Sequence, residues 1–101
     1  AGALLGAVLG SEIGKSLDKA DQLYAERTAQ DALENSPSNQ TSQWSNPDSG
    51  NTGTVTPTET YQTTDGQYCR EYQTTVTVGD ETQDAYGTAC RQPDGSWKIQ
   101  S

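Results

Sequence analysis

The chain has 101 residues, of which 30% are hydrophobic, and it contains no phenylalanine, methionine or histidine. Its 14 acidic residues outnumber 6 basic ones, which gives a formal net charge of −8. This length allows one small domain with an appendage, and the acidic excess argues against nucleic acid or an anionic membrane surface as an electrostatic partner. Histidine is the commonest general base and metal ligand, so its absence disfavours an enzyme. The sequence therefore predicts a binding or structural protein with no catalytic residue, no cofactor and no metal site.

Composition divides the chain into three stretches. Residues 1–35 hold most of the alanine and leucine and favour a helix, whereas residues 36–53 are rich in serine, asparagine, proline and glycine, as is typical of a linker. Residues 54–101 are rich in threonine, valine, tyrosine and glutamine and favour strands. We expect an α+β fold, in which one helix is followed by an antiparallel β meander of four or five strands.

The first stretch carries a glycine at every fourth position, namely Gly2, Gly6, Gly10 and Gly14. On a helix this spacing places all four on one stripe. Each glycine costs about 1 kcal/mol relative to alanine in an exposed helix, and close packing of a second helix would compensate for that cost. The pattern predicts helix packing at these glycines, within a homo-oligomer or against lipid or another membrane protein. The alternative is the buried start of a soluble helix that tolerates its glycines.

The apolar run at residues 1–10 is too short to cross a bilayer alone. It covers about 15 Å as a helix, whereas a hydrocarbon core is about 30 Å thick. We therefore expect it to be the end of a longer element, half of a hairpin, or a plug in a partner's groove.

From Ser11 the pattern becomes amphipathic, with Leu17, Tyr24 and Leu33 on the apolar face and Asp21 among the residues facing water. The sequence predicts one nearly continuous helix that ends at Asn35.

The two cysteines are predicted to form a disulfide from the position of a turn. Gly79-Asp80 fits a two-residue hairpin loop that begins with glycine. Pairing outward from this loop places Cys69 opposite Cys90, as a non-hydrogen-bonded pair whose close Cα atoms suit a disulfide. Such a bridge implies an oxidising compartment.

A second hairpin signal, Asp65-Gly66, sets the register of the preceding strand. As a two-residue turn it places Val55 opposite Val76 and Tyr61 opposite Arg70. A third turn leads into a last strand at residues 96–99, residues 43–45 could add an edge strand, and the helix is expected to cover the sheet.

Five aromatic side chains could form a ligand platform, although the shortage of apolar residues favours a place in the core: Tyr61, Tyr68, Tyr72, Tyr86 and Trp97.

Three stretches of the chain resemble the rickettsial-type seventeen-kilodalton surface antigen family of Gram-negative envelope lipoproteins. They are GALLGAVLGSEIGKSLD, WSNPDSGNTGTVTPTETYQTTDGQYCREYQTTVTVG and AYGTACRQPDGSWKI. The first is similar to the second half of a glycine-zipper two-helix membrane domain. The resemblance implies an outer-membrane location, facing the periplasm or the cell surface, and a disulfide-bonded β domain. It also implies a lipidated cysteine and a first zipper helix upstream, which this sequence does not contain.

The leading hypothesis is a non-catalytic outer-membrane protein with a structural or assembly role through glycine-mediated helix packing. The alternative is a secreted or periplasmic binding module with one disulfide, such as an inhibitor of a cell-wall hydrolase. In that case residues 47–53 would form the loop that reaches into a partner's cleft.

Overall fold

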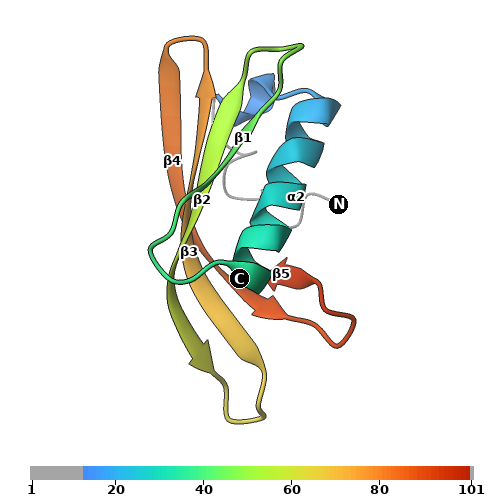
Figure 1. Ribbon diagram of the computed structural model, residues 1–101, viewed down its shortest axis with the longest axis vertical. Helices are drawn as coiled ribbons and strands as arrows, with labels where there is room; N and C mark the ends of the chain where they lie inside the picture. Colours follow the sequence, from blue (N-terminus) through green and yellow to red (C-terminus); the bar gives the residue numbers. More distant parts are fainter. Residues whose placement is uncertain (1–12, 101) are drawn as a thin grey trace.

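The computed structural model describes residues 13–100 as one helix packed against one sheet. The strands form a single antiparallel sheet in chain order, and the helix lies across one of its faces (Figure 1). This confirms the α+β class and the meander, and residues 43–45 do lie in a fifth strand. The elements are a 3₁₀ turn η2 (Gly14–Ser16), helix α2 (Lys19–Asn35), and strands β1 (Ser42–Ser45), β2 (Thr52–Gln62), β3 (Tyr68–Val78), β4 (Glu81–Arg91) and β5 (Trp97–Ile99).

Helix α2 begins at Lys19 because Asp18 caps it. The Asp18 carboxylate accepts a hydrogen bond from the backbone N–H of Asp21 at 2.7 Å, and the Asp21 carboxylate accepts one from the backbone N–H of Asp18 at 3.0 Å. This reciprocal capping box satisfies two N–H groups at the helix start, and the backbone of Leu17 and Asp18 is extended. The prediction of one nearly continuous helix is therefore wrong at residues 17–18, while residues 1–12 lie outside the described part of the chain.

The face of α2 that meets the sheet consists mainly of alanine. Ala25, Ala29 and Ala32 are almost fully buried, whereas Tyr24, predicted on the apolar face, is 40% exposed. The small alanine side chains let the helix approach the sheet closely, and large side chains from the strands fill the space between the helix and the sheet. Of the residues predicted on the apolar face, Leu17 and Leu33 are buried and Tyr24 is not, because the part of the helix face that meets the sheet follows the alanines.

The core has two parts along the length of the helix. The part near the end of α2 contains Ala29, Ala32, Leu33, Val55, Tyr72, Ala89 and Trp97. The part near its start contains Leu17, Ala25, Trp44 and Val76, with Ile13, Val78 and Ala85 packed against it. Both short edge strands thus contribute a tryptophan to the core, so the helix and the sheet share one hydrophobic interior. The stretch 36–53, expected to be a linker, includes β1.

The register between β3 and β4 is as predicted. Val78 pairs with Glu81 across the loop Gly79-Asp80, and Cys69 pairs with Cys90. Gly79 has a φ of +64°, a backbone conformation that glycine adopts without steric cost and that the first position of this turn requires. The turn residues therefore fixed the alignment of the two cysteines.

The predicted register between β2 and β3 is wrong. Val55 pairs with Thr74 rather than with Val76, and Tyr61 pairs with Cys69. The hydrogen bond from Thr63 N to Gln67 O, 2.9 Å long, closes a three-residue turn that contains Asp65-Gly66. A bulge between residues 57 and 59 shifts the pairing by one further position.

Candidate functional site

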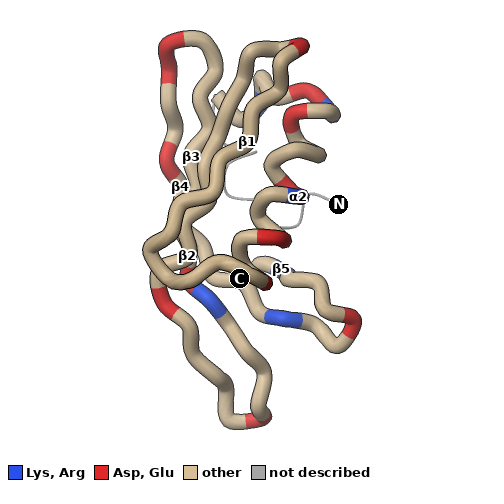
Figure 2. Tube along the Cα trace, viewed as in Figure 1, with Lys and Arg blue, Asp and Glu red and all other residues tan. Residues whose placement is uncertain are grey.

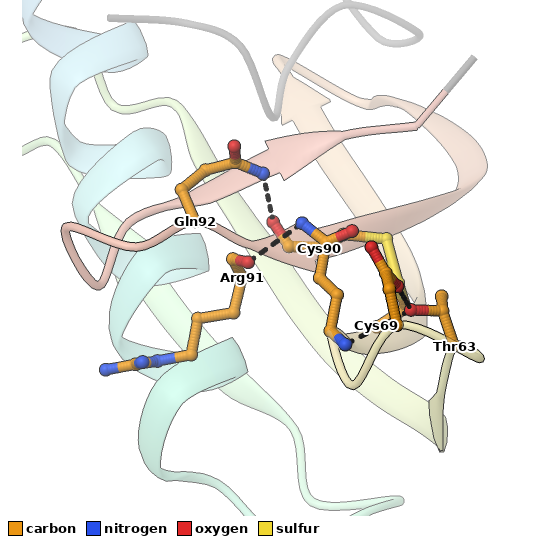
Figure 3. The surroundings of a disulfide bond; sticks show 7 residues. Thr63, Cys69, Cys90, Arg91 and Gln92 are labelled. Atoms are coloured by element: carbon orange, nitrogen blue, oxygen red, sulfur yellow. Dashed lines mark hydrogen bonds between the residues drawn. A yellow bond between two sulfur atoms is a disulfide. The ribbon is translucent and has the colours of Figure 1, made fainter.

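The disulfide between Cys69 and Cys90 joins β3 to β4 on the sheet face opposite α2, which confirms the predicted pair. Both cysteines are buried. Figure 3 shows Arg91, the next residue, pointing away from the disulfide and toward α2. The alternation of side chains along a strand produces this arrangement, so the disulfide holds the strand from which Arg91 reaches the helix.

Polar side chains tie the β2–β3 hairpin to the end of β4 around the disulfide (Figure 3). Gln67 Nε2 donates to the carbonyl of Arg91 at 3.0 Å, and Gln92 Nε2 donates to the carbonyl of Cys90 at 3.0 Å. The Thr63 hydroxyl donates to the Asp65 carboxylate within the turn, and this bond lowers the pKa of Asp65. The hairpin is thereby fixed relative to β4.

An open groove of about 410 Å³ lies between the end of α2 and strands β3 and β4, which the disulfide joins. A second groove of about 370 Å³ adjoins the first, because Tyr68 and Arg91 line both grooves. In Figure 2, basic segments of β3 and β4 lie close to the acidic end of α2. The first groove is lined by Leu33, Glu34, Asn35, Ser36, Pro37, Thr60, Tyr68, Arg70, Arg91 and Trp97.

Arg70 is the buried cation of this groove. It is only 7% exposed, and its Nη1 donates to the carbonyls of Ala32 and Leu33 at 3.3 and 2.8 Å. Its Nε donates to Thr60 Oγ1 at 2.9 Å. The guanidinium thus satisfies carbonyls at the C-terminal end of α2, where the helix dipole favours a positive charge. Burial lowers the pKa of Arg70, although an arginine stays charged at neutral pH.

Glu34 also lines this groove, and its carboxylate has two hydrogen-bonding partners. Arg91 donates to its carboxylate twice, from Nε at 2.9 Å and from Nη2 at 3.2 Å, and Trp97 Nε1 donates at 2.9 Å. The hydrogen bonds from Arg91 and then Trp97 lower the pKa of Glu34. Gln30 also exchanges two 2.9 Å hydrogen bonds with the backbone of Trp97. These contacts hold β5 against the helix and shape the groove.

The carboxylate of Asp21 is buried at the other end of α2 and organises the loop between β1 and β2. Its Oδ1 accepts from Asn46 Nδ2 at 2.8 Å and from Ser49 Oγ at 2.6 Å, and its Oδ2 accepts from Asn51 Nδ2 at 2.8 Å. Burial raises the pKa of Asp21, but hydrogen bonds from Ser49, Asn51 and the Asp18 backbone, with Asn46, outweigh it, so the pKa lies below its ordinary 3.8. The prediction that Asp21 faces water is wrong.

The aromatic residues are divided between the core and the surface. Tyr72 and Trp97 are buried, as predicted, and burial together with the charge of Glu26 raises the pKa of Tyr72 to about 12. Tyr61, Tyr68 and Tyr86 are 44%, 53% and 73% exposed, so their predicted place in the core is wrong. Of these three, Tyr68 lines the groove.

Of the glycines predicted to pack against a second helix, only Gly14 falls within the described residues. Gly14 is buried at the start of η2, and Gly2, Gly6 and Gly10 lie outside the described part. No helix within residues 13–100 combines the length and apolarity needed to cross a bilayer. In the same residues, no cluster of cysteine, aspartate and glutamate could hold a metal ion.

Residues 31–98 match the family model described as 17 kDa outer membrane surface antigen. This range begins in the last turns of α2, ends within β5, and includes the groove and the disulfide. The chain belongs to this family. The 17 kDa surface antigen of Rickettsia bellii is 60% identical over 98% of the chain, and that of Rickettsia conorii is 57% identical over 82%. The antigen of Rickettsia prowazekii is 56% identical over 81% of the chain.

The chain spans 62% of the length of the Rickettsia bellii antigen and 52% of the Rickettsia conorii antigen. No solved structure matches the chain. The surface antigen family is not a known enzyme family.

Sequence reasoning missed both Arg70 and Asp21 as organising residues. Arg70 was placed in a strand but not connected to the helix, because its carbonyl partners lie 37 and 38 positions away. For Asp21 a signal was present: Asn46, Ser49 and Asn51 cluster in one turn-rich stretch, and such side chains often bond a nearby polar group.

Proposed function

We propose that this chain is part of a non-catalytic outer-membrane lipoprotein, in which the first residues pack at the membrane and the helix–sheet domain extends into an oxidising space. The identity of 60% with the Rickettsia bellii surface antigen carries this proposal. The Cys69–Cys90 disulfide supports it, because disulfides persist outside the reducing cytosol.

The role of the first residues rests on the spacing of Gly2, Gly6 and Gly10. A stripe of small residues lets two helices approach closely where the hydrophobic effect no longer drives association. In this proposal the helix partner is a second copy of the chain or another membrane protein, and the function is structural.

Vesicle binding tests the membrane role of residues 1–12, whose deletion removes no residue of the described domain. Residues 1–101 and residues 13–101 are each mixed with phosphatidylcholine vesicles and centrifuged. We expect the longer chain to sediment with the vesicles and the shorter one to stay in the supernatant. Equal sedimentation of the two would contradict the proposal, and circular dichroism checks that both are folded.

A binding module in the periplasm or outside the cell is a second candidate, and the loop between β1 and β2 favours it. Pro47, Asp48, Ser49 and Gly50 are exposed at its tip, while Asn46 and Asn51 anchor it on Asp21. A loop held in one conformation loses little entropy when it binds a partner. Capture of the same envelope partner by residues 1–101 and 13–101 would favour this candidate.

A further inference from the structure

Most of β4 forms a free edge of the sheet. Strand β5 pairs with residues 89–91, and the backbone N–H of Gln100 donates to the carbonyl of Thr88 at 2.6 Å. No strand of the described chain lies beside residues 81–87 on that side (Figure 1). This stretch, the free edge of β4, is as long as a typical strand.

The backbone of this edge directs hydrogen-bonding groups away from the sheet. The β3–β4 pair next to the two-residue loop is hydrogen-bonded, and hydrogen-bonded pairs alternate from there. Thr82, Asp84 and Tyr86 therefore turn their N–H and C=O groups away from β3. The carbonyl of Asp84 accepts a hydrogen bond from Gln83 Nε2 at 2.9 Å, in agreement with this orientation. A strand added beside β4 would satisfy the whole row.

The opposite edge of the sheet is protected against pairing. On β2 the edge is interrupted by Pro57 and the bulge that follows it, and Asn39 N donates to the carbonyl of Pro57 at 2.6 Å. Proline, bulges and covering segments are usual means of blocking an edge. Residues 81–87 contain no proline and no lysine, and their pairing with β3 has no bulge. The free edge of β4 is thus suited to a strand from another molecule.

The charges along this edge select the kind of strand. Glu81 and Asp84 are exposed and form no ion pair with the residues that the structure describes, and the hairpin is acidic in Figure 2. Antiparallel pairing with a second copy, centred on this edge, would place Asp84 directly opposite its counterpart, which is unfavourable. A lysine or arginine at that position would instead be attracted. The ring of Tyr86, 73% exposed on the same face, also favours a cation.

A hollow beside the start of β4 is suited to an apolar side chain. It has a volume of about 260 Å³ and is lined by Ile13, Ser16, Val78 and Glu81. Ile13 and Val78 pack against the core on the α2 side of the sheet. Since successive side chains of a strand point to opposite faces, an added strand with basic residues on the exposed face would direct the alternate ones toward this side.

We propose that the free edge of β4 binds an extended segment of a partner protein in which basic residues alternate with apolar ones. The segment lies antiparallel to β4 and exchanges backbone hydrogen bonds with Thr82, Asp84 and Tyr86. Its basic side chains lie beside the Asp84 carboxylate, and an apolar side chain enters the hollow at Ile13. In such strand addition the backbone supplies affinity and the alternate side chains supply specificity. The site does not depend on the membrane role proposed above, because its residues belong to the helix–sheet domain.

Peptides that differ only in charge test the choice of partner. Acetyl-Val-Lys-Val-Lys-Val-Lys-Val-amide, and the same peptide with glutamate in place of lysine, are titrated into the isotopically labelled chain of residues 1–101. We expect the lysine peptide to bind at least about fivefold more tightly, as for one exposed ion pair. It should also slow hydrogen exchange at the amides of Thr82, Asp84 and Tyr86. Failure of the lysine peptide to bind, or equal binding of the two peptides, would overturn the proposal.

N-methylation of the lysine peptide separates strand addition from charge attraction. In the proposed pairing the lysines lie directly opposite the outward-facing residues of β4 and direct their N–H groups toward it, whereas the valines direct theirs away. A peptide methylated at the lysine nitrogens of its backbone should therefore lose binding, and one methylated at the valine nitrogens should keep it. Equal binding of the methylated peptides, or the reverse order, would contradict the pairing.

Two charge-reversal variants provide a matched pair at exposed positions. Asp84→Lys should remove the preference for the lysine peptide, whereas Glu59→Lys, which changes the net charge equally but lies on β2, should keep it. The same loss of preference in both variants would mean that only the overall charge attracts the peptide, and would overturn the site.

Hydrogen exchange of the chain without peptide tests the other possible occupants of the edge. We expect fast exchange at Thr82, Asp84 and Tyr86 at every protein concentration. Slow exchange in dilute solution would assign the edge to the first residues of the same chain, and protection that rises with protein concentration would assign it to a second copy. Either result would overturn the proposal.

Discussion

At the scale of single residues, two charged side chains fix the two ends of α2. Asp21 gathers the loop between β1 and β2 at the start of the helix, and Arg70 holds the last carbonyls at its end. Both side chains are buried, with relative exposures of 0% and 7%. Buried charges remain favourable only when hydrogen bonds satisfy them, so each position depends on its partners.

Replacement of Asp21 by asparagine tests the first of these positions. Asn46 and Asn51 would lose a charged acceptor inside the protein, and we expect the free energy of unfolding to fall by about 3 kcal/mol. Urea unfolding followed by circular dichroism measures the change. Asp31→Asn on the exposed side of the same helix is the control and should change stability by less than about 0.5 kcal/mol. Similar losses in both variants would show that Asp21 does not organise the loop.

The pH dependence of stability provides a separate test of Asp21. Since its pKa is lower in the folded protein than its ordinary 3.8, its contribution is complete above the unfolded value and disappears as the pH falls through the folded value. The stability difference between the wild type and Asp21→Asn should therefore be constant from pH 7 to pH 5 and should narrow toward pH 3. A difference that widens below pH 4 would mean that the pKa is raised instead. Comparing the two proteins removes the effects of the other acidic groups.

At the scale of elements, the disulfide and the turns decide how the strands align. The Cys69–Cys90 pairing could be predicted because Gly79-Asp80 is next to both strands and a two-residue turn admits one register. The β2–β3 alignment could not, because Asp65-Gly66 also fits a three-residue turn and the bulge after Pro57 has no clear sequence signal. Local turn chemistry predicts register well only when it specifies the loop length.

The candidate groove could not be predicted from local sequence either. Tyr68 and Arg70 were identified as strand residues, but the groove also needs the end of α2 and β5, and only tertiary packing brings these together. Tyr61 was predicted in the core because the expected register placed it opposite Arg70, on the sheet face that meets α2, whereas it lies opposite Cys69. Asp21 was predicted to face water because a single acidic residue on an amphipathic helix is usually solvated.

Reduction of the disulfide should destabilise the sheet measurably. The bridge closes a loop across a sequence separation of 21, for which the chain-entropy model gives about 3 kcal/mol. We expect the urea midpoint of the wild type to fall on addition of reductant. The variant with both Cys69→Ala and Cys90→Ala should already unfold at the lower midpoint and should not respond. If the wild type kept its midpoint after complete reduction, the disulfide would not contribute to stability.

At the scale of the whole molecule, a small acidic domain is built from few apolar residues. Alanines on α2 bring the helix close to the sheet, and Trp44, Tyr72 and Trp97 are the largest side chains in the two core clusters. Because the edge strands carry the two tryptophans, the helix packs against both edges of the sheet. In the function proposed above, this domain would present the groove and the β1–β2 loop on the aqueous side of the membrane.

In the function proposed above, glycines at every fourth position let the first residues pack against another helix in the membrane. Gly6→Leu combined with Gly10→Leu adds bulk on the glycine stripe, and Ala3→Leu combined with Ala7→Leu adds bulk with the same spacing beside it. Cross-linking in native membranes, with the full-length protein carrying each pair, is the most direct measurement. We predict that the glycine variant loses most of its cross-linked species while the alanine variant keeps them, and an unchanged cross-linking pattern in the glycine variant would contradict the claim.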